Sequence, residues 1–117
     1  MDIVVADNEE KLARCMEYLK KKNVAFLEYT LYFYVEIDGE IKALAGHNYN
    51  FGATIEPFVT EGNAYSKYLY AGMQMFFYAK GYKIMNVITK SPAVIDTVKK
   101  LGFVEYPNIE YFYTKII

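Results

Sequence analysis

The sequence predicts one α/β domain, in which a mixed central β-sheet carries helices on both faces. Three observations predict this class. Strand-like and helix-like segments alternate along residues 1–117, which favours parallel neighbours in a sheet. Asp38-Gly39 stands between two apolar runs and is typical of a tight hairpin, which adds antiparallel neighbours. Residues 83–103 read as a strand, a capped helix and the start of another strand.

Composition narrows the range of functions. A chain of 117 residues with 54% hydrophobic residues can bury a core as one domain. Its net charge of −1 gives no basis for a nucleic-acid partner or a membrane-surface partner. Cys15 is the single cysteine, so we expect no disulfide and no metal site. No apolar stretch approaches the roughly 20 residues of a membrane span, and no secretory pattern opens the chain, so we expect a cytoplasmic protein.

The first half of the chain begins with a short strand, residues 2–6. Asp7 and Glu10 have the spacing of a capping box, and apolar residues on one face predict a helix over residues 8–22. Aromatic and β-branched residues then predict a hairpin with arms 31–37 and 40–46. Residues 47–52 have the composition of a loop.

The middle of the chain is a strand followed by a helix. The strand, residues 53–60, contains Pro57, which removes a ladder hydrogen bond and predicts a bulged or unpaired site. The helix, residues 66–80, has its main apolar stripe on one side. Further apolar residues leave little polar face, so we expect this helix to be covered on more than one side: Tyr68, Tyr70, Met75 and Tyr78.

The C-terminal third has the clearest helix signals. A strand over residues 83–89 precedes Ser91, which can cap a helix, and Pro92, which suits the first helical position. Gly102 can end that helix in a left-handed conformation. A final strand pair, 104–106 and 109–117, surrounds Pro107-Asn108.

This order of elements resembles the GNAT family of acyl-CoA acyltransferases over nearly the whole chain. Lys80-Gly81-Tyr82-Lys83 and Lys100-Leu101-Gly102-Phe103 resemble the joints around the family's fifth strand and last helix. The resemblance implies acetyl-CoA as cofactor, with its pantetheine arm between the fourth and fifth strands. Carried onto this sequence, it implies the following cofactor-binding residues: Phe58, Val59, Thr60, Gly62, Asn63, Ala64, Ser66 and Ser91.

The sequence departs from the family pattern at two places. The family's pyrophosphate loop has an Arg or Gln before its glycine, whereas here Glu61 precedes Gly62-Asn63-Ala64 and adds a negative charge, which Lys67 can offset. The tyrosine that protonates the departing thiolate in many family members is replaced by Val98. Acetyl-CoA binding is therefore expected to be weak or absent.

Glu56 and His47 are the candidates for a general base, because a carboxylate or an imidazole near the parting strands can deprotonate an amine. Each also has a simpler interpretation, as a solvated strand residue and as a loop histidine with no task. Cys15 lies on an apolar helical face and is interpreted as a core residue.

Two functions stay open at this point. The first is an N-acetyltransferase that moves an acetyl group from acetyl-CoA to a small-molecule or protein amine. The second is a catalytically inactive GNAT-like protein that binds a protein partner or itself; compact members of this kind occur in phage genomes and virions. The 18% aromatic content favours either tyrosines that fill the core and its rim or an adhesive surface.

Overall fold

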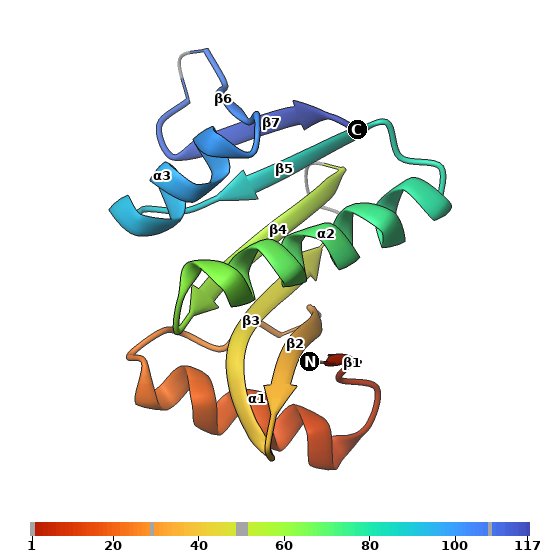
Figure 1. Cartoon of the computed structure of the whole chain (residues 1–117), viewed down its shortest axis with the longest axis vertical. Coiled ribbons are helices and arrows are strands. Elements are labelled where there is room, and N and C mark those ends of the chain that lie inside the picture. The colour runs from red at the N-terminus through yellow and green to blue at the C-terminus, as the bar shows by residue number, and fades with distance from the viewer. Residues whose placement is uncertain (1, 29, 49–51, 108) are drawn as a thin grey trace.

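A mixed seven-stranded sheet forms the centre of the molecule, in the order β1-β2-β3-β4-β5-β7-β6 (Figure 1). The computed structural model describes residues 2–28, 30–48, 52–107 and 109–117. The pair β4–β5 is parallel, and the other neighbouring pairs are antiparallel. The strands are β1 (Asp2–Val5), β2 (Leu31–Ile37), β3 (Glu40–Asn48), β4 (Ala53–Thr60), β5 (Ile84–Ile88), β6 (Val104–Glu105) and β7 (Phe112–Ile116).

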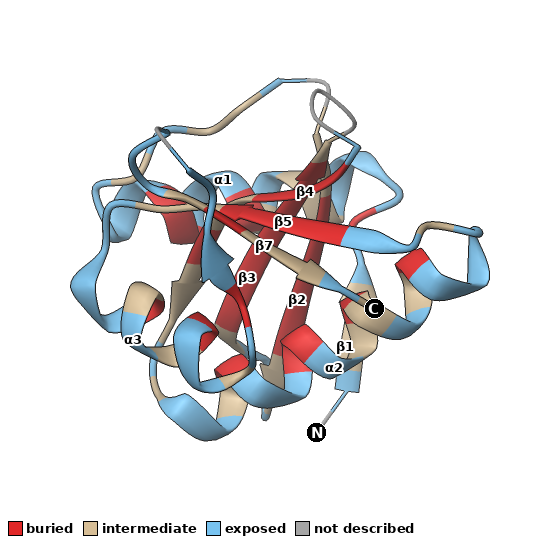
Figure 2. Ribbon diagram, turned by 90° about the horizontal axis from the view of Figure 1, so that it is seen from above, coloured by how far each residue is buried: buried red, intermediate tan, exposed pale blue. Residues whose placement is uncertain are grey.

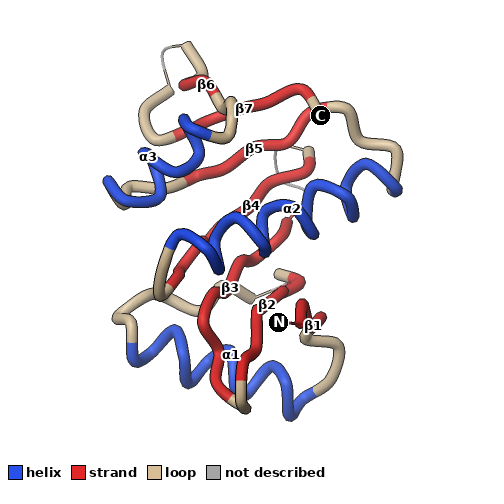
Figure 3. The backbone as a smooth tube through the Cα atoms, viewed as in Figure 1, coloured by secondary structure: helices blue, strands red, loops and turns tan. Residues whose placement is uncertain are grey.

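Helices cover both faces of the sheet, as predicted. One helix, α1 (Glu9–Lys21), packs on β2 and β3 from one side (Figure 3). The other two, α2 (Asn63–Ala79) and α3 (Pro92–Lys100), pack on the opposite side. Burial is concentrated in the central strands and in the helix faces turned toward them (Figure 2). The sheet therefore separates a smaller cluster under α1 from a larger one under α2 and α3.

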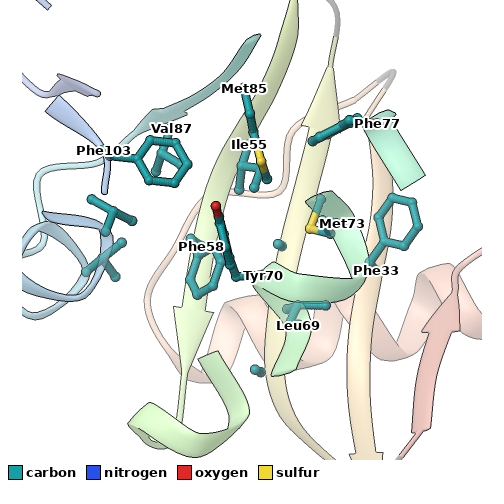
Figure 4. Close-up of a cluster of buried hydrophobic side chains, with 14 of the residues drawn as sticks. Phe33, Ile55, Phe58, Leu69, Tyr70, Met73, Phe77, Met85, Val87 and Phe103 are labelled. Carbon is teal, nitrogen blue, oxygen red and sulfur yellow. The ribbon is translucent and has the colours of Figure 1, made fainter. Parts of the chain in front are cut away.

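The larger cluster packs side chains of α2 and α3 against the central strands (Figure 4). Leu69, Met73 and Phe77 of α2 are fully enclosed, whereas Phe76 and Leu101 are half-buried and pack against the cluster. Val87 of β5, Val98 of α3 and Phe103 are also buried in this cluster. Cys15 lies in the smaller cluster, where burial raises the pKa of its thiol to about 11 and keeps it protonated.

Local hydrogen bonds at the N-termini determine where α1 and α3 begin. Ser91 accepts a hydrogen bond from the Val94 amide and Pro92 opens α3, both as predicted. The capping box predicted at Asp7 is wrong: Asn8 caps α1 by accepting from the Lys11 amide at 2.9 Å. Asp7 instead forms an ion pair with Lys11.

Predicted boundaries are wrong at three places. The loop predicted over residues 47–52 starts two residues too early, because His47 and Asn48 pair with Ile55 and Thr54 as part of β3; positions 49–51 of that loop lie outside the described residues. The helix predicted from Ser66 begins at residue 63, since the chain enters it directly after Gly62. The final strand pair is present but shorter than predicted.

Candidate functional site

The strands β4 and β5 separate midway along β4, and we call this place the parting. They pair from Ala53–Met85 to Ile55–Val87, after which β4 continues to Thr60 without a partner on β5. The half of β4 that follows Ile55 pairs with β3 on its other edge. Its edge toward β5 therefore carries backbone groups that no strand uses, as Pro57 in the sequence predicted.

A bulge lies where the parting begins. Ala45 pairs with Phe58 and His47 pairs with Ile55, so Gly46 alone faces the two residues Glu56 and Pro57. The Glu56–Pro57 peptide is cis. A Cβ at Gly46 would overlap the Glu56 carbonyl oxygen and lie 2.6 Å from Thr30 Cγ2. The bulge thus depends on a glycine in the facing strand.

Beyond the parting, β4 leads at once into α2 through Glu61 and Gly62. The Thr60 hydroxyl accepts from the Gly62 amide at 3.1 Å and closes this turn. The Ser66 hydroxyl donates to the Gly62 carbonyl at 3.1 Å and is buried, so its side chain holds the turn and does not face a ligand. The amides of residues 63–65 precede the first intrahelical donor, the Ser66 amide, and point out of the helix N-terminus.

The start of α2 lies beside α3. The Thr97 hydroxyl is 3.4 Å from the Asn63 side-chain oxygen, so one polar contact joins the two helices. Ser91 caps α3 three residues after the end of β5 at Ile88. The implied cofactor-binding residues therefore lie on three elements: the free half of β4, the N-terminus of α2 and the residue that precedes α3.

Glu61 is placed differently from what the sequence suggested. Its carboxylate forms an ion pair with Lys22 at 2.7 Å and accepts from the Tyr18 hydroxyl at 3.2 Å. The hydrogen bond from Lys22 holds the pKa of Glu61 below its usual value. Its charge is thus compensated on the α1 side, and it opposes an anion at the α2 N-terminus less than the sequence indicated.

The two candidate bases have unlike surroundings. Glu56 is half-buried at the bulge, next to the free edge of β4. His47 is 1% exposed and packs edge-on to Phe77 with ring centres 4.4 Å apart. Its Nδ1 lies 3.2 Å from the Thr54 carbonyl, so Nδ1 carries the proton, and burial lowers the pKa of the imidazole. Glu56 is better placed for proton transfer.

Aromatic side chains fill the α2-side face of the parting (Figure 4). Tyr70 projects from α2 beside Phe58 of β4, and its ring contacts Phe103 at 5.6 Å. Its hydroxyl accepts from Lys115 Nζ at 2.9 Å, and the same ammonium donates to the Leu101 carbonyl at 2.6 Å. Sequence reasoning did not identify this group, because its members are far apart along the chain.

Two cavities, of about 500 and 750 Å³, lie on the α1 side. The first has charged walls, which include Arg14, Lys21 and Glu61, and the second is lined by α1 and residues 23–26. Neither is lined by β5, α2 or α3. In the described part of the chain, no group of three or more His, Cys, Asp or Glu residues could hold a metal ion. No described helix has the length and hydropathy needed to cross a membrane.

Solved structures share this arrangement. A GNAT-family acetyltransferase from Streptococcus pneumoniae is 12% identical with a TM-score of 0.69, and the match covers 99% of this chain and 100% of that one. The ribosomal-protein-S18-alanine N-acetyltransferase of Escherichia coli is 16% identical with a TM-score of 0.62, covering 98% and 90%.

An acetyltransferase from Bacillus anthracis, solved in complex with acetyl coenzyme A, is 14% identical with a TM-score of 0.64, covering 86% and 70%. No protein-family model and no curated protein matches the sequence. At these identities the likeness is one of architecture. The order of elements, the parallel β4–β5 pair that parts at a bulge, and the match to these structures over nearly the full chain show that this protein has the GNAT fold.

Proposed function

We propose that the chain binds acetyl-CoA where β4 and β5 part and transfers the acetyl group to an amine. The observation that carries this proposal is the free edge of β4, which leads directly into the N-terminus of α2. An extended ligand with amide groups can hydrogen-bond to such an edge as an added strand would. A phosphate group is favoured at the helix end that follows it.

The residues present fit the two ends of such a ligand. The amides of residues 63–65 head α2, and Lys67 one turn on adds a positive charge. With Glu61 held by Lys22, the helix end keeps its preference for anions. The aromatic wall of Phe58, Tyr70 and Phe103 is apolar and suits the methylene groups of a pantetheine arm, once Tyr70 moves aside.

Acetyl transfer to an amine needs few catalytic groups from the protein. The amine nitrogen attacks the thioester carbonyl carbon, a C–N bond forms, and the C–S bond breaks. The amine gives up one proton, and the departing thiolate gains one. Glu56, at the bulge, is proposed to accept the amine proton. Val98 is buried and cannot donate a proton, so we propose that water supplies the proton to the thiolate.

A second candidate function rests on the aromatic side chains that fill the space where β4 and β5 separate. Phe58, Tyr70 and Phe103 close its α2-side face, and Lys115 ties Tyr70 to the end of α3. A protein that keeps this packing would hold the GNAT architecture without acetyl-CoA and act as a binding module. The two candidate functions differ in whether the Tyr70 side chain moves to make room for acetyl-CoA.

A product assay separates the candidates. We would incubate the protein with acetyl-CoA and a panel of amines that includes N-terminal peptide amines, and measure free CoA by chromatography. The proposal expects amine-dependent release, lowered roughly 10²-fold or more by Glu56→Gln. Glu105→Gln, at an exposed carboxylate on β6, is the matched control and should leave the rate unchanged. Release no faster than in buffer with every amine would favour the binding module.

A further inference from the structure

The helix α2 has a second apolar face, turned away from the sheet. Its buried side holds Leu69, Met73 and Phe77. On the opposite side, exposed apolar residues recur at alternating spacings of four and three, and we call them the outer stripe: Ala64, Tyr68, Ala71, Met75 and Tyr78. Met75 is 73% exposed and Tyr78 is 69% exposed, so most of each of these two side chains is in contact with solvent.

A surface helix normally presents charged residues to solvent. In α2, Lys67 is the single charged residue from Asn63 to Ala79, and it flanks the outer stripe rather than interrupting it. Exposed apolar patches that exceed a few hundred Å² often mark interaction sites. The sequence predicted that this helix is covered on more than one side. In the structure Tyr70 is buried beside Phe103, whereas the other three residues of that prediction are exposed: Tyr68, Met75 and Tyr78.

We propose that the outer stripe is where two copies of this chain associate, with their α2 helices antiparallel about a two-fold axis at Ala71. Alanine at the crossing point lets two helices approach to about 8 Å. This arrangement places Ala64 of each copy opposite Tyr78 of the other, and Tyr68 opposite the turn that holds Met75. Small residues thus face large ones at the two ends of the contact, Ala71 faces its own copy at the centre, and Tyr68 packs beside Met75 between them.

The charges fit the same arrangement. No carboxylate lies on α2, so none is buried. The two Lys67 side chains lie on opposite sides of the axis, separated by about 12 Å along the helices, at 1.5 Å per residue. Antiparallel helices also place each helix N-terminus near the partner's C-terminus, where their dipoles attract.

The area predicts a weak dimer. The exposed parts of Tyr68, Met75 and Tyr78 present roughly 400 Å² per copy, taking about 200 Å² for each large side chain. A stable interface buries about 800 Å² per partner. The association should therefore be reversible, with a dissociation constant in the micromolar to millimolar range.

Sedimentation analysis of the full chain over a concentration series tests the proposal. The wild type should shift from monomer to dimer, and Met75→Lys should weaken the association roughly tenfold or more, because a lysine would be buried without a partner. Ile116→Lys, at an 82% exposed position on β7, is the matched control and should associate as the wild type does. Circular dichroism melting confirms that both variants fold.

Two cysteine substitutions test the antiparallel arrangement of the two α2 helices. Under mild oxidation, Ala71→Cys should form an intermolecular disulfide, since residues at a two-fold axis come within the roughly 4.4–6.8 Å between Cα atoms that a disulfide needs. Lys67→Cys should not, and Cys15 is enclosed and will not interfere. A wild type that stays monomeric throughout, or a dimer that persists undiminished in Met75→Lys, would overturn the proposal.

Discussion

Replacing Gly46 by alanine should disturb the bulge that begins the parting of β4 and β5. The added Cβ would overlap the Glu56 carbonyl oxygen and lie 2.6 Å from Thr30 Cγ2 and 3.0 Å from Pro57 Cδ. A methyl group forced into a packed site costs about 1–3 kcal/mol. Because one of the obstructing atoms belongs to the backbone and the bulge leaves it little room, we expect about 3 kcal/mol.

Urea unfolding followed by circular dichroism measures this change. Gly62→Ala is the matched control, because its added Cβ would meet only ordinary contacts, the nearest at 3.8 Å to Tyr65. Its free energy of unfolding should fall by no more than about 1 kcal/mol, the effect expected for alanine at a helix cap. If the free energy of unfolding of Gly46→Ala lies within about 0.5 kcal/mol of the wild-type value, β3 does not pack closely against the bulge.

Three further results are expected. Phe77→Ala should lower the free energy of unfolding by about 3–5 kcal/mol and the half-buried Phe76→Ala by about 2 kcal/mol, and equal small losses in urea unfolding would contradict the packing described. The pKa of His47 is lowered by burial, so its contribution to stability is present above the unfolded pKa of about 6.5 and is lost as pH falls below it; the pH dependence of unfolding should flatten in that window in His47→Gln. Glu61→Gln should strengthen acetyl-CoA binding less than Lys67→Ala weakens it, because Lys22 already compensates Glu61; the opposite order in calorimetry would place Glu61 at the phosphate.

The sequence predicted the features that depend on short-range chemistry. Pro57 predicted the interrupted pairing of β4, and Ser91-Pro92 predicted the start of α3, because each residue limits its own backbone. The glycine at position 46 carried a usable signal that was missed, since a glycine inside a strand often marks a bulge or a close backbone approach.

The remaining features depend on partners that are distant along the chain. Glu61 turns toward α1 because Lys22 and Tyr18, about forty residues earlier, hold it there. His47 was read as a loop residue from its polar neighbours, whereas pairing with Ile55 keeps it in β3 beneath Phe77. Neither placement follows from local propensity, because tertiary contacts decide it.

The proposed site places acetyl-CoA along the free half of β4, with its phosphate end at the start of α2. The most direct test is a titration of the isotopically labelled protein with acetyl-CoA, followed by amide chemical shifts. We expect saturable shifts at residues 58–60 and 63–65, and weaker binding at high salt. Unchanged amides at millimolar acetyl-CoA, or shifts confined to the charged cavity around Arg14 and Lys21, would contradict it.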